Sequence, residues 1–390
     1  LVGMEIAPET QRATLEALGF AVEPAEGGRY AVSPPSWRPD VKGEADLVEE
    51  VARVASLTKL ESRPLPRASD RALAPTLTPR QRRMRRVRRA LADQGLNECV
   101  SYAFCSEREA ALCGGGGAAM ALDNPISSEL THMRPSALPP LLAAAARNQA
   151  RGADALALFE LGAGFHGPDP GDQADVAVAL RAGFSEAREW TGARRPVDLW
   201  DARADAEAAL AACGVALDKL QVAREAPGFL HPGRSAALKL GPKLTLAWFG
   251  ELHPRALEAM DVRGPAVAAL VFADAAPWPK AKGAARAALD TSDLQAVERD
   301  FAFVVDARVE AADLLRAARG ADKALIVDAG VFDVFAGDRA EAQLGEGRKS
   351  VALWVRLQPR ARTLTDEEIE AVSAKIVAAA EAATGAVLRA

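Results

Sequence analysis

The chain has 390 residues and a formal net charge of −5, and 49% of its residues are hydrophobic and 26% charged. This composition is typical of a globular protein and excludes a disordered tail or a collagen-like fibre, and the length corresponds to about two to four domains. No apolar run reaches the roughly 18 residues that span a bilayer, so we expect no membrane partner. The four cysteines form no CxxC pair, which favours reduced thiols and a cytoplasmic protein.

The first segment of the chain shows the pattern of two helices around a small hairpin. The expected elements are a helix over residues 8–18, strands over 20–23 and 30–32, and a second helix over 43–57. Apolar residues at helical spacing place Leu47, Val51 and Val54 on the buried face of the second helix.

The second segment opens with the clearest helix start in the sequence. Thr78 suits the N-cap, Pro79 the first helical position, and Gln81 stands where a capping box needs it, so we expect a helix from here to Gln94. Strands are expected at 98–104, 155–165, 176–180, 236–240, 245–250 and 266–272, and helices at 139–149, 202–212 and 254–260. This order predicts a mixed α/β domain with antiparallel strand pairing.

The third segment has the most regular pattern. The order βαββαβ follows from a strand at 301–306, a helix at 310–319, strands at 324–335 and 349–357, a helix capped by Thr365 and a strand at 387–388. This is the order of a ferredoxin-like sandwich. Two stretches rich in proline and alanine, 64–77 and 277–290, separate the three segments and are predicted to be linkers.

Four acidic residues gather around the start of the second helix. Asp46, Glu49 and Glu50 stand at helical positions i, i+3 and i+4, and Asp40 lies in the turn before them. Carboxylate oxygens alone make a hard site that suits Mg²⁺ and not zinc. The alternative is that these acids lie solvated at a helix N-terminus, where negative charge is favourable, or pair with neighbouring cations. Those cations are Arg38, Lys42 and Arg53.

Positive charge is concentrated in the helix that follows Thr78. Seven arginines occupy ten positions of this helix: Arg80, Arg82, Arg83, Arg85, Arg86, Arg88 and Arg89. Arginine binds phosphates through two parallel hydrogen bonds, so such a helix could run along a nucleic acid. Charge runs more often form a solvated surface that pairs with acids elsewhere, and we favour this interpretation from the sequence.

Several segments resemble one family, the beta subunits of bacterial phenylalanyl-tRNA synthetases. SPPSWRPD at 33–40 and EADLVEEVAR at 44–53 resemble the B5 domain of these subunits. The catalytic-like core is matched by NPISSE at 124–129, HMRPS at 132–136, LFELG at 158–162, LHPGRS at 230–235 and FGELHP at 249–254. The ferredoxin-fold anticodon-binding domain is matched by ERDFAFVV at 298–305, FDVF at 332–335, KSVA at 349–352 and RTLTDEE at 362–368.

The resemblance implies the C-terminal part of a beta subunit, beginning inside its B5 domain, with a multidomain α+β fold. The implied domains are a B5 helix-hairpin-helix domain at 1–66, a catalytically inactive class II synthetase-like antiparallel α/β core at 78–280, and a ferredoxin-like anticodon-binding domain at 290–390. Active class II enzymes hold ATP with arginines that the matching strands here lack. We therefore expect no catalytic residue in this chain, and ATP bound by the alpha subunit.

The resemblance also implies a metal site and partners. The family holds Mg²⁺ on B5 acids in a site shared with the alpha subunit, and the matching residues are Asp40, Asp46, Glu49 and Glu50. The family forms an (αβ)₂ heterotetramer that joins phenylalanine to tRNAPhe, in which this part of the beta subunit is a scaffold for the alpha subunit.

For the third segment, the resemblance implies recognition of the tRNAPhe anticodon. The positions that match the family's recognition residues are Asp333, Phe335 and Ser350, and Phe335 stands where the family usually has tyrosine. The loop at 336–348 is a few residues longer than usual.

Two other functions remain as alternatives. One is a stand-alone RNA-binding or scaffold protein built from the same domains. The other is a metal-dependent hydrolase that uses the acids of the B5 segment, although no nucleophile or general base accompanies those acids.

Overall fold

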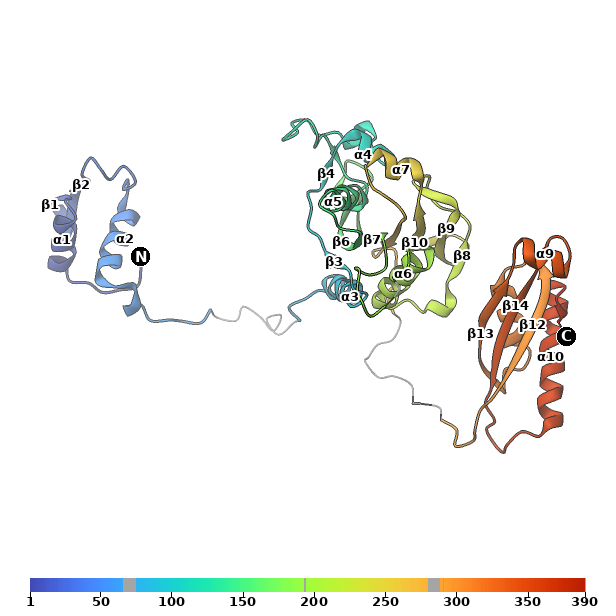
Figure 1. Cartoon of the computed structure of the whole chain (residues 1–390). Helices are drawn as coiled ribbons and strands as arrows, with labels where there is room; N and C mark the ends of the chain where they lie inside the picture. The colour runs from blue at the N-terminus through green and yellow to red at the C-terminus, as the bar shows by residue number, and fades with distance from the viewer. Residues whose placement is uncertain (66–74, 193, 280–287, 290, 390) are drawn as a thin grey trace. The chain divides into compact units, whose positions relative to one another are not determined.

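The computed structural model describes residues 1–65, 75–192, 194–279, 288–289 and 291–389 (Figure 1). The chain divides into two compact units, residues 1–280 and 281–390. The predicted linkers at 64–77 and 277–290 lie largely outside the described residues. Within those ranges, no helix is long and apolar enough to cross a membrane.

Two helices and a hairpin form the N-terminal part of the first unit. The elements are α1 (Pro8–Ala17), β1 (Ala21–Ala25), the single turn η1 (Glu26–Gly28), β2 (Arg29–Ser33), α2 (Glu44–Ala55) and η2 (Leu57–Lys59). Strands β1 and β2 pair antiparallel. The predicted helices and hairpin are confirmed, and they enclose a small core of Leu15, Phe20, Val22, Val41 and Val51.

The buried face of α2 differs from the predicted one. Val51 is buried, but Val54 is 51% exposed, so the prediction for Val54 is wrong. Glu50 is buried, because its carboxylate accepts hydrogen bonds from Arg38 and Arg53. A charge can leave water only where partners replace its hydration.

A seven-stranded sheet forms the centre of the rest of the first unit, in the order β3-β6-β7-β11-β10-β9-β8. Its strands are β3 (Asn97–Glu98), β6 (Ala155–Phe165), β7 (Gln173–Gly183), β8 (Gln221–Ala223), β9 (Leu230–Leu240), β10 (Leu244–Leu252) and β11 (Ala266–Phe272). Among the described strands of this sheet, only β3 and β6 pair parallel, so the predicted antiparallel pairing is confirmed for the long strands.

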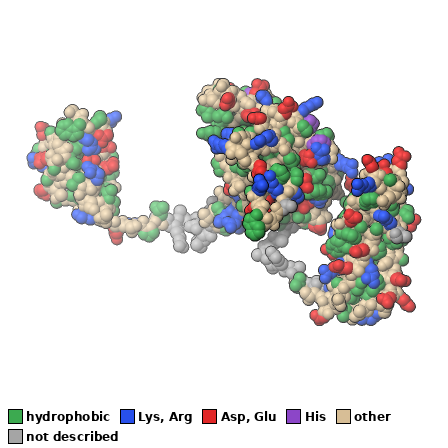
Figure 2. All heavy atoms as spheres, in the orientation of Figure 1, with side chains coloured by type: hydrophobic (Ala, Val, Ile, Leu, Met, Phe, Trp, Pro, Cys, Tyr) green, Lys and Arg blue, Asp and Glu red, His purple; other side chains and the backbone are tan. Residues whose placement is uncertain are grey.

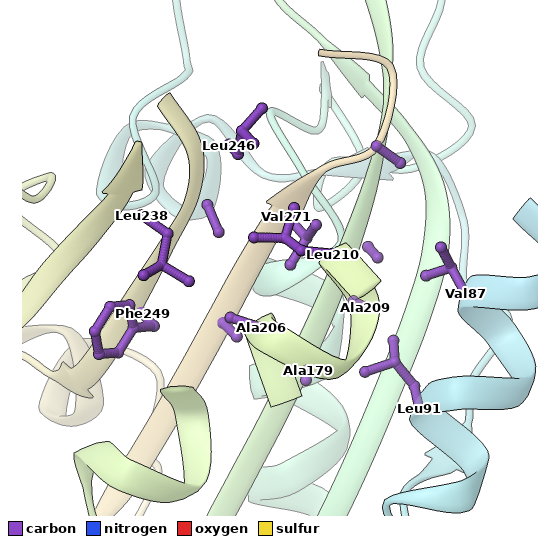
Figure 3. Packing of buried hydrophobic residues seen from close by; sticks show 14 of the residues in the cluster. Val87, Leu91, Ala179, Ala206, Ala209, Leu210, Leu238, Leu246, Phe249 and Val271 are labelled. Carbon is purple, nitrogen blue, oxygen red and sulfur yellow. The ribbon is translucent and has the colours of Figure 1, made fainter. Parts of the chain in front are cut away.

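Helices cover both faces of this sheet. They are α3 (Pro79–Asp93), α4 (Glu107–Leu112), α5 (Leu138–Ala150), α6 (Leu199–Cys213) and α7 (Pro254–Ala259), with single turns η4 (Ala118–Met120), η5 (Pro170–Asp172) and η6 (Leu217–Lys219). Helices α3 and α6 pack on one face, and α5 and α7 on the other. Figure 3 shows Val87 and Leu91 of α3 and the alanines of α6 against the sheet.

Two details of this region depart from the sequence-based prediction. The strand expected at 98–104 is interrupted: β3 ends at Glu98, and the next strand, β4 (Phe104–Cys105), pairs with β5 (His132–Met133). The prediction also missed α4 and β8. Elements this short carry too few residues for a hydrophobic period to stand out.

A buried ion pair links two of the family-like motifs. Arg134 and Glu160 are 4% and 6% exposed, and Arg134 Nη1 lies 2.6 Å from Glu160 Oε1. Ser101 completes the group, because it accepts from Arg134 and donates to Glu160. Gly162 leaves room for the arginine, since a Cβ there would lie 2.6 Å from Arg134 Nη2.

The second unit is a four-stranded antiparallel sheet, ordered β13-β14-β12-β15, with helices packed on one face. Its elements are β12 (Val297–Asp306), α8 (Ala311–Gly320), β13 (Ile326–Phe335), α9 (Asp338–Leu344), β14 (Arg348–Leu357), α10 (Asp366–Thr384) and β15 (Val387–Leu388). The predicted βαββαβ order is confirmed. The long loop at 336–348 contains the short helix α9.

We expect Arg134→Ala to lower the free energy of unfolding of the first unit by about 3–5 kcal/mol, because it leaves the Glu160 carboxylate buried without its cation. Urea denaturation followed by circular dichroism measures this loss. Arg234→Ala, which removes an exposed partner of Glu251 in the same unit, should cost about 1 kcal/mol or less. Equal effects of the two variants would contradict the argument.

Candidate functional sites

Asp46 closes the turn that leads into α2. Its Oδ2 accepts hydrogen bonds from the backbone N–H groups of Lys42, at 2.8 Å, and Gly43, at 2.9 Å. These bonds lower the pKa of Asp46, because they stabilise the charged carboxylate. Asp46 thus caps the start of α2. Lys42 contacts the Asp46 carboxylate through its backbone N–H group.

Arg38 joins two of the other predicted acids. Its Nη2 lies 2.7 Å from Asp40 Oδ2, and its Nη1 lies 2.9 Å from Glu50 Oε2. The guanidinium lowers the pKa of Asp40, and together with Arg53 it lowers the pKa of Glu50 to about 2. In this structure, Asp40 and Glu50 therefore pair with arginine. This pairing is one of the two alternatives to a metal site that the sequence left open.

The four predicted metal ligands are not gathered around one point. Glu49 is exposed, and the other three carboxylates are bound by Arg38 or by backbone N–H groups. Across the described residues, no group of three or more His, Cys, Asp or Glu side chains is arranged to hold a metal ion. The ligand chemistry suits Mg²⁺, but the cation between Asp40 and Glu50 in this arrangement is the Arg38 guanidinium.

In the described part of the second unit, the helices α8 and α10 pack on one face of the sheet only. Along β14, Val351, Leu353, Val355 and Leu357 are buried in the core with α8 and α10. Side chains alternate between the two faces of a strand, so residues 350, 352, 354 and 356 lie on the opposite face. We call this the open face.

All three predicted anticodon residues belong to the open face. Phe335 stands directly opposite Ser350, and Asp333 opposite Ala352. Directly opposed residues of an antiparallel pair share a face. A bulge between Val331 and Asp333 produces this placement, because the extra residue shifts the alternation along β13.

The open face also carries groups that the sequence analysis missed. Trp354 stands opposite Gly330, and a Cβ on Gly330 would come within 2.6 Å of the indole nitrogen. The tryptophan therefore lies across the glycine. Arg389 lies with its guanidinium carbon 6.0 Å from the centre of the Phe335 ring. The two-residue period from Ser350 reaches Trp354, and this signal could have identified it.

Three family descriptions match consecutive parts of the chain. "tRNA synthetase B5 domain" matches residues 1–56, "Phenylalanyl tRNA synthetase beta chain CLM domain" matches 66–271, and "Ferredoxin-fold anticodon binding domain" matches 292–389. These matches follow the order of the resemblance in the sequence.

Curated relatives match along the whole chain. The phenylalanine–tRNA ligase beta subunit of Cereibacter sphaeroides is 60% identical over 389 residues, and that of Ruegeria pomeroyi is 58% identical over 389 residues. Each alignment covers 100% of this chain and 48% of the relative, so the chain spans about half the length of these proteins. A pyrrolysyl tRNA synthetase from Desulfitobacterium hafniense superposes with a TM-score of 0.37 and 17% identity over 48% of this chain and 64% of that one, a likeness too low to assign a fold.

Lowering the pH should destabilise the N-terminal helices and hairpin, because Glu50 becomes protonated. The pKa of about 2 in the folded chain lies below the usual 4.5, so the carboxylate stabilises the fold above pH 4.5 and loses this effect as the pH falls towards 2. We expect hydrogen-exchange protection of α2 to fall more steeply with acid in the wild type than in Glu50→Gln.

Glu49→Gln is the matched control, because Glu49 is exposed on the same turn of α2. It should keep the wild-type response to acid. The same response in Glu50→Gln as in the wild type would show that the Arg38–Glu50 contact does not govern this stability.

Proposed function

The chain belongs to the phenylalanyl-tRNA synthetase beta chain family, and from this membership we propose that it acts in the ATP-dependent ligation of phenylalanine to tRNAPhe. In this proposal it supports a catalytic alpha subunit and binds the anticodon. The observation that carries the proposal is the succession of B5, CLM and anticodon-binding matches along one chain. No residue of this chain is assigned a catalytic role, and ATP is bound by the alpha subunit.

We propose the three domains at 1–66, 78–280 and 290–390. The separate cores support this division: one cluster lies in the N-terminal helices and hairpin, two lie on the faces of the seven-stranded sheet, and one lies in the second unit. The middle domain is proposed to be a class II synthetase-like core without its chemistry. Its long antiparallel strands with helices on both faces support this assignment.

The surface of the middle domain supports its role as a scaffold. Val100 and Tyr102 are large hydrophobic residues that are exposed in this chain. Exposed apolar groups that lie together indicate a protein interface. Val100 and Tyr102 also line an open cleft of about 920 Å³ beside α4 and α5. We assign this surface to the alpha subunit, in an (αβ)₂ heterotetramer.

A Mg²⁺ site on Asp40, Asp46, Glu49 and Glu50 is proposed for the assembled protein. Oxygen-only ligands support the metal type. The Arg38 contacts with Asp40 and Glu50 must be exchanged for the metal, since the guanidinium and Mg²⁺ need the same oxygens. Ligands from the alpha subunit would complete the shell and favour this exchange.

Anticodon binding is assigned to the open face of the second unit. Single-stranded bases are recognised by stacking on aromatic side chains and by hydrogen bonds to their edges. Phe335 and Trp354 supply rings on this face, and the exposed carboxylate of Asp333 is an acceptor beside them. Ser350 of β14 stands opposite Phe335 of β13, and its side chain is buried.

The chain alone should show no ATP–pyrophosphate exchange, whereas a complex with the alpha subunit should charge tRNAPhe.

Tyr102→Asp should weaken this complex on gel filtration, because it places a charge in an apolar contact. Trp190→Asp, at an exposed tryptophan outside that surface, is the control. Failure of the wild-type chain to bind the alpha subunit would favour a stand-alone RNA-binding or scaffold protein.

The same complex tests the metal proposal. Asp46→Asn keeps an oxygen that can accept the backbone hydrogen bonds of Lys42 and Gly43 but removes one negative charge. The metal content of the complex should fall in this variant. Unchanged Mg²⁺ binding would exclude Asp46 as a ligand.

Phe335→Ala should abolish the footprint of the chain on the anticodon loop, with a loss of about 1–3 kcal/mol in tRNA binding free energy for the stacked base. Nuclease footprinting measures the protection. Phe335→Tyr keeps the ring and should keep the footprint, and Trp190→Ala controls for the loss of an exposed aromatic residue. A footprint that survives in Phe335→Ala would remove Phe335 from the site.

A further inference from the structure

The open face of the second unit carries a tryptophan that is not among the positions implied by the family resemblance. Trp354 of β14 stands opposite Gly330 of β13 on one side and opposite Asp300 of β12 on the other. Strand β14 lies between β13 and β12, so Trp354 is on an inner strand of the sheet. Its side chain is partly exposed, which means that the sheet supports one part of the ring and leaves another part accessible.

Gly330 makes room for the ring of Trp354. A Cβ built on Gly330 would lie 2.6 Å from Nε1, 2.7 Å from Cε2 and 2.8 Å from Cζ2 of the indole. The indole therefore occupies the space that any other residue at this position would need for its own side chain. A ring that already packs on the backbone of the sheet has little freedom left to lose when a ligand contacts it, and such preorganisation favours binding.

Trp354 and Phe335 are too far apart to hold the same base. Phe335 stands opposite Ser350, four residues before Trp354 on β14. At ~3.4 Å per residue of an antiparallel strand, the two positions are about 14 Å apart along the sheet. Neighbouring bases of a stacked strand are only about 3.4 Å apart, so each ring takes a base of its own. Four-stranded sheets that bind single-stranded RNA likewise stack two or three bases on their aromatic side chains.

The charges around Trp354 favour a base over a phosphate. On this end of the open face the exposed charged residues are Glu298, Asp300, Asp328 and Arg356. Asp328 is bound by Arg319 of α8, which leaves two carboxylates on β12 against one guanidinium. A phosphate beside the ring would be repelled by Asp300, whereas an uncharged base would not. Figure 2 shows Asp and Glu among the Lys and Arg side chains on the visible face of this unit.

We propose that Trp354 is a second stacking platform for tRNA, which holds an unpaired base of the anticodon loop other than the base held by Phe335. The proposal rests on the anticodon-binding function assigned above to the open face and adds a second base to it. The ring contacts the face of a base and reads none of its edges. Trp354 therefore adds affinity for any loop sequence and leaves recognition of the anticodon to the other residues of the face.

The first test is tRNAPhe binding by the 390-residue chain with Trp354→Leu. Leucine still covers Gly330 with apolar atoms but has no aromatic face, so the affinity should fall by about 5- to 150-fold, the range for one stacked base. Trp354→Phe keeps a ring and should bind like the wild type. Trp190→Leu, which removes an exposed tryptophan of the first unit, should also bind like the wild type.

The salt dependence of binding distinguishes a stacked base from a phosphate contact. Loss of stacking should leave the slope of log K against log salt unchanged in Trp354→Leu, whereas loss of one phosphate contact would change this slope by about one. A changed slope would overturn the proposal.

The second test replaces each nucleotide of the anticodon loop in turn by an abasic one. With the wild-type chain, two separate positions should weaken binding, and a single sensitive position would overturn the proposal even if the Trp354 variants do not fold. One of these positions should cause no further loss in Trp354→Leu, and a different one should cause no further loss in Phe335→Ala. Coupling of both variants to one nucleotide would show that the two rings share a base.

The outcomes separate this proposal from the function on which it rests. A wild-type chain that binds no tRNA overturns both. Weakened binding in Phe335→Ala together with wild-type affinity in Trp354→Leu overturns the second platform alone. An equal fold-loss in Trp354→Leu for tRNAs with altered anticodons supports a contact that reads no base, and a loss confined to one anticodon overturns that part of the proposal.

Discussion

The structure depends on pairing the charges that its cores bury. Five charged side chains are buried among the described residues: Glu50, Arg83, Arg134, Glu160 and Asp205. Each has a partner of opposite charge or carbonyl oxygens within hydrogen-bond distance. An unpaired charge in such a place costs several kcal/mol, which is a large part of the stability of a domain. The pairs therefore fix how segments far apart in the sequence meet, as when Arg134 of the segment after β5 meets Glu160 of β6.

The sequence predicted most of the helices and long strands, because these have local signals. Thr78 and Thr365 each cap a helix with the capping box read from the sequence, and the apolar period of the strands is visible over many residues. Val54 shows the limit of such signals. Its spacing matches the buried side of α2, yet Val54 is 51% exposed, while Glu50 on the same helix is buried through its contacts with Arg38 and Arg53. Contacts between distant residues have no local signal.

The candidate sites could be predicted from the sequence only in part, because they too depend on contacts that have no local signal. The three proposed anticodon positions came from resemblance, and a bulge in β13 is what puts Asp333 and Phe335 on the open face with Ser350. A bulge inserts one residue into a period of two, and nothing in the residue pattern of β13 reports it. At the acidic cluster, the helical spacing was right, but the choice between metal and arginine depends on a guanidinium that reaches Asp40 and Glu50 together.

The arginines of α3 show how one residue type acquires two roles on one helix. The position of each arginine around the helix axis relative to the sheet decides its partners. Arg83 shares the side of Met84 and Val87 and must satisfy its charge on carbonyl oxygens, while Arg82 and Arg86 lie in water. The net charge of −5 is a sum over regions with opposite charge. Screening confines the field of an exposed group to about 8–10 Å at physiological salt, so a nearby ion experiences the local side chains and not the average charge of the chain. An acidic protein can therefore keep a local positive surface: on α3, Asp175 and Glu98 compensate only Arg80 and Arg88, while Arg82 and Arg86 are exposed.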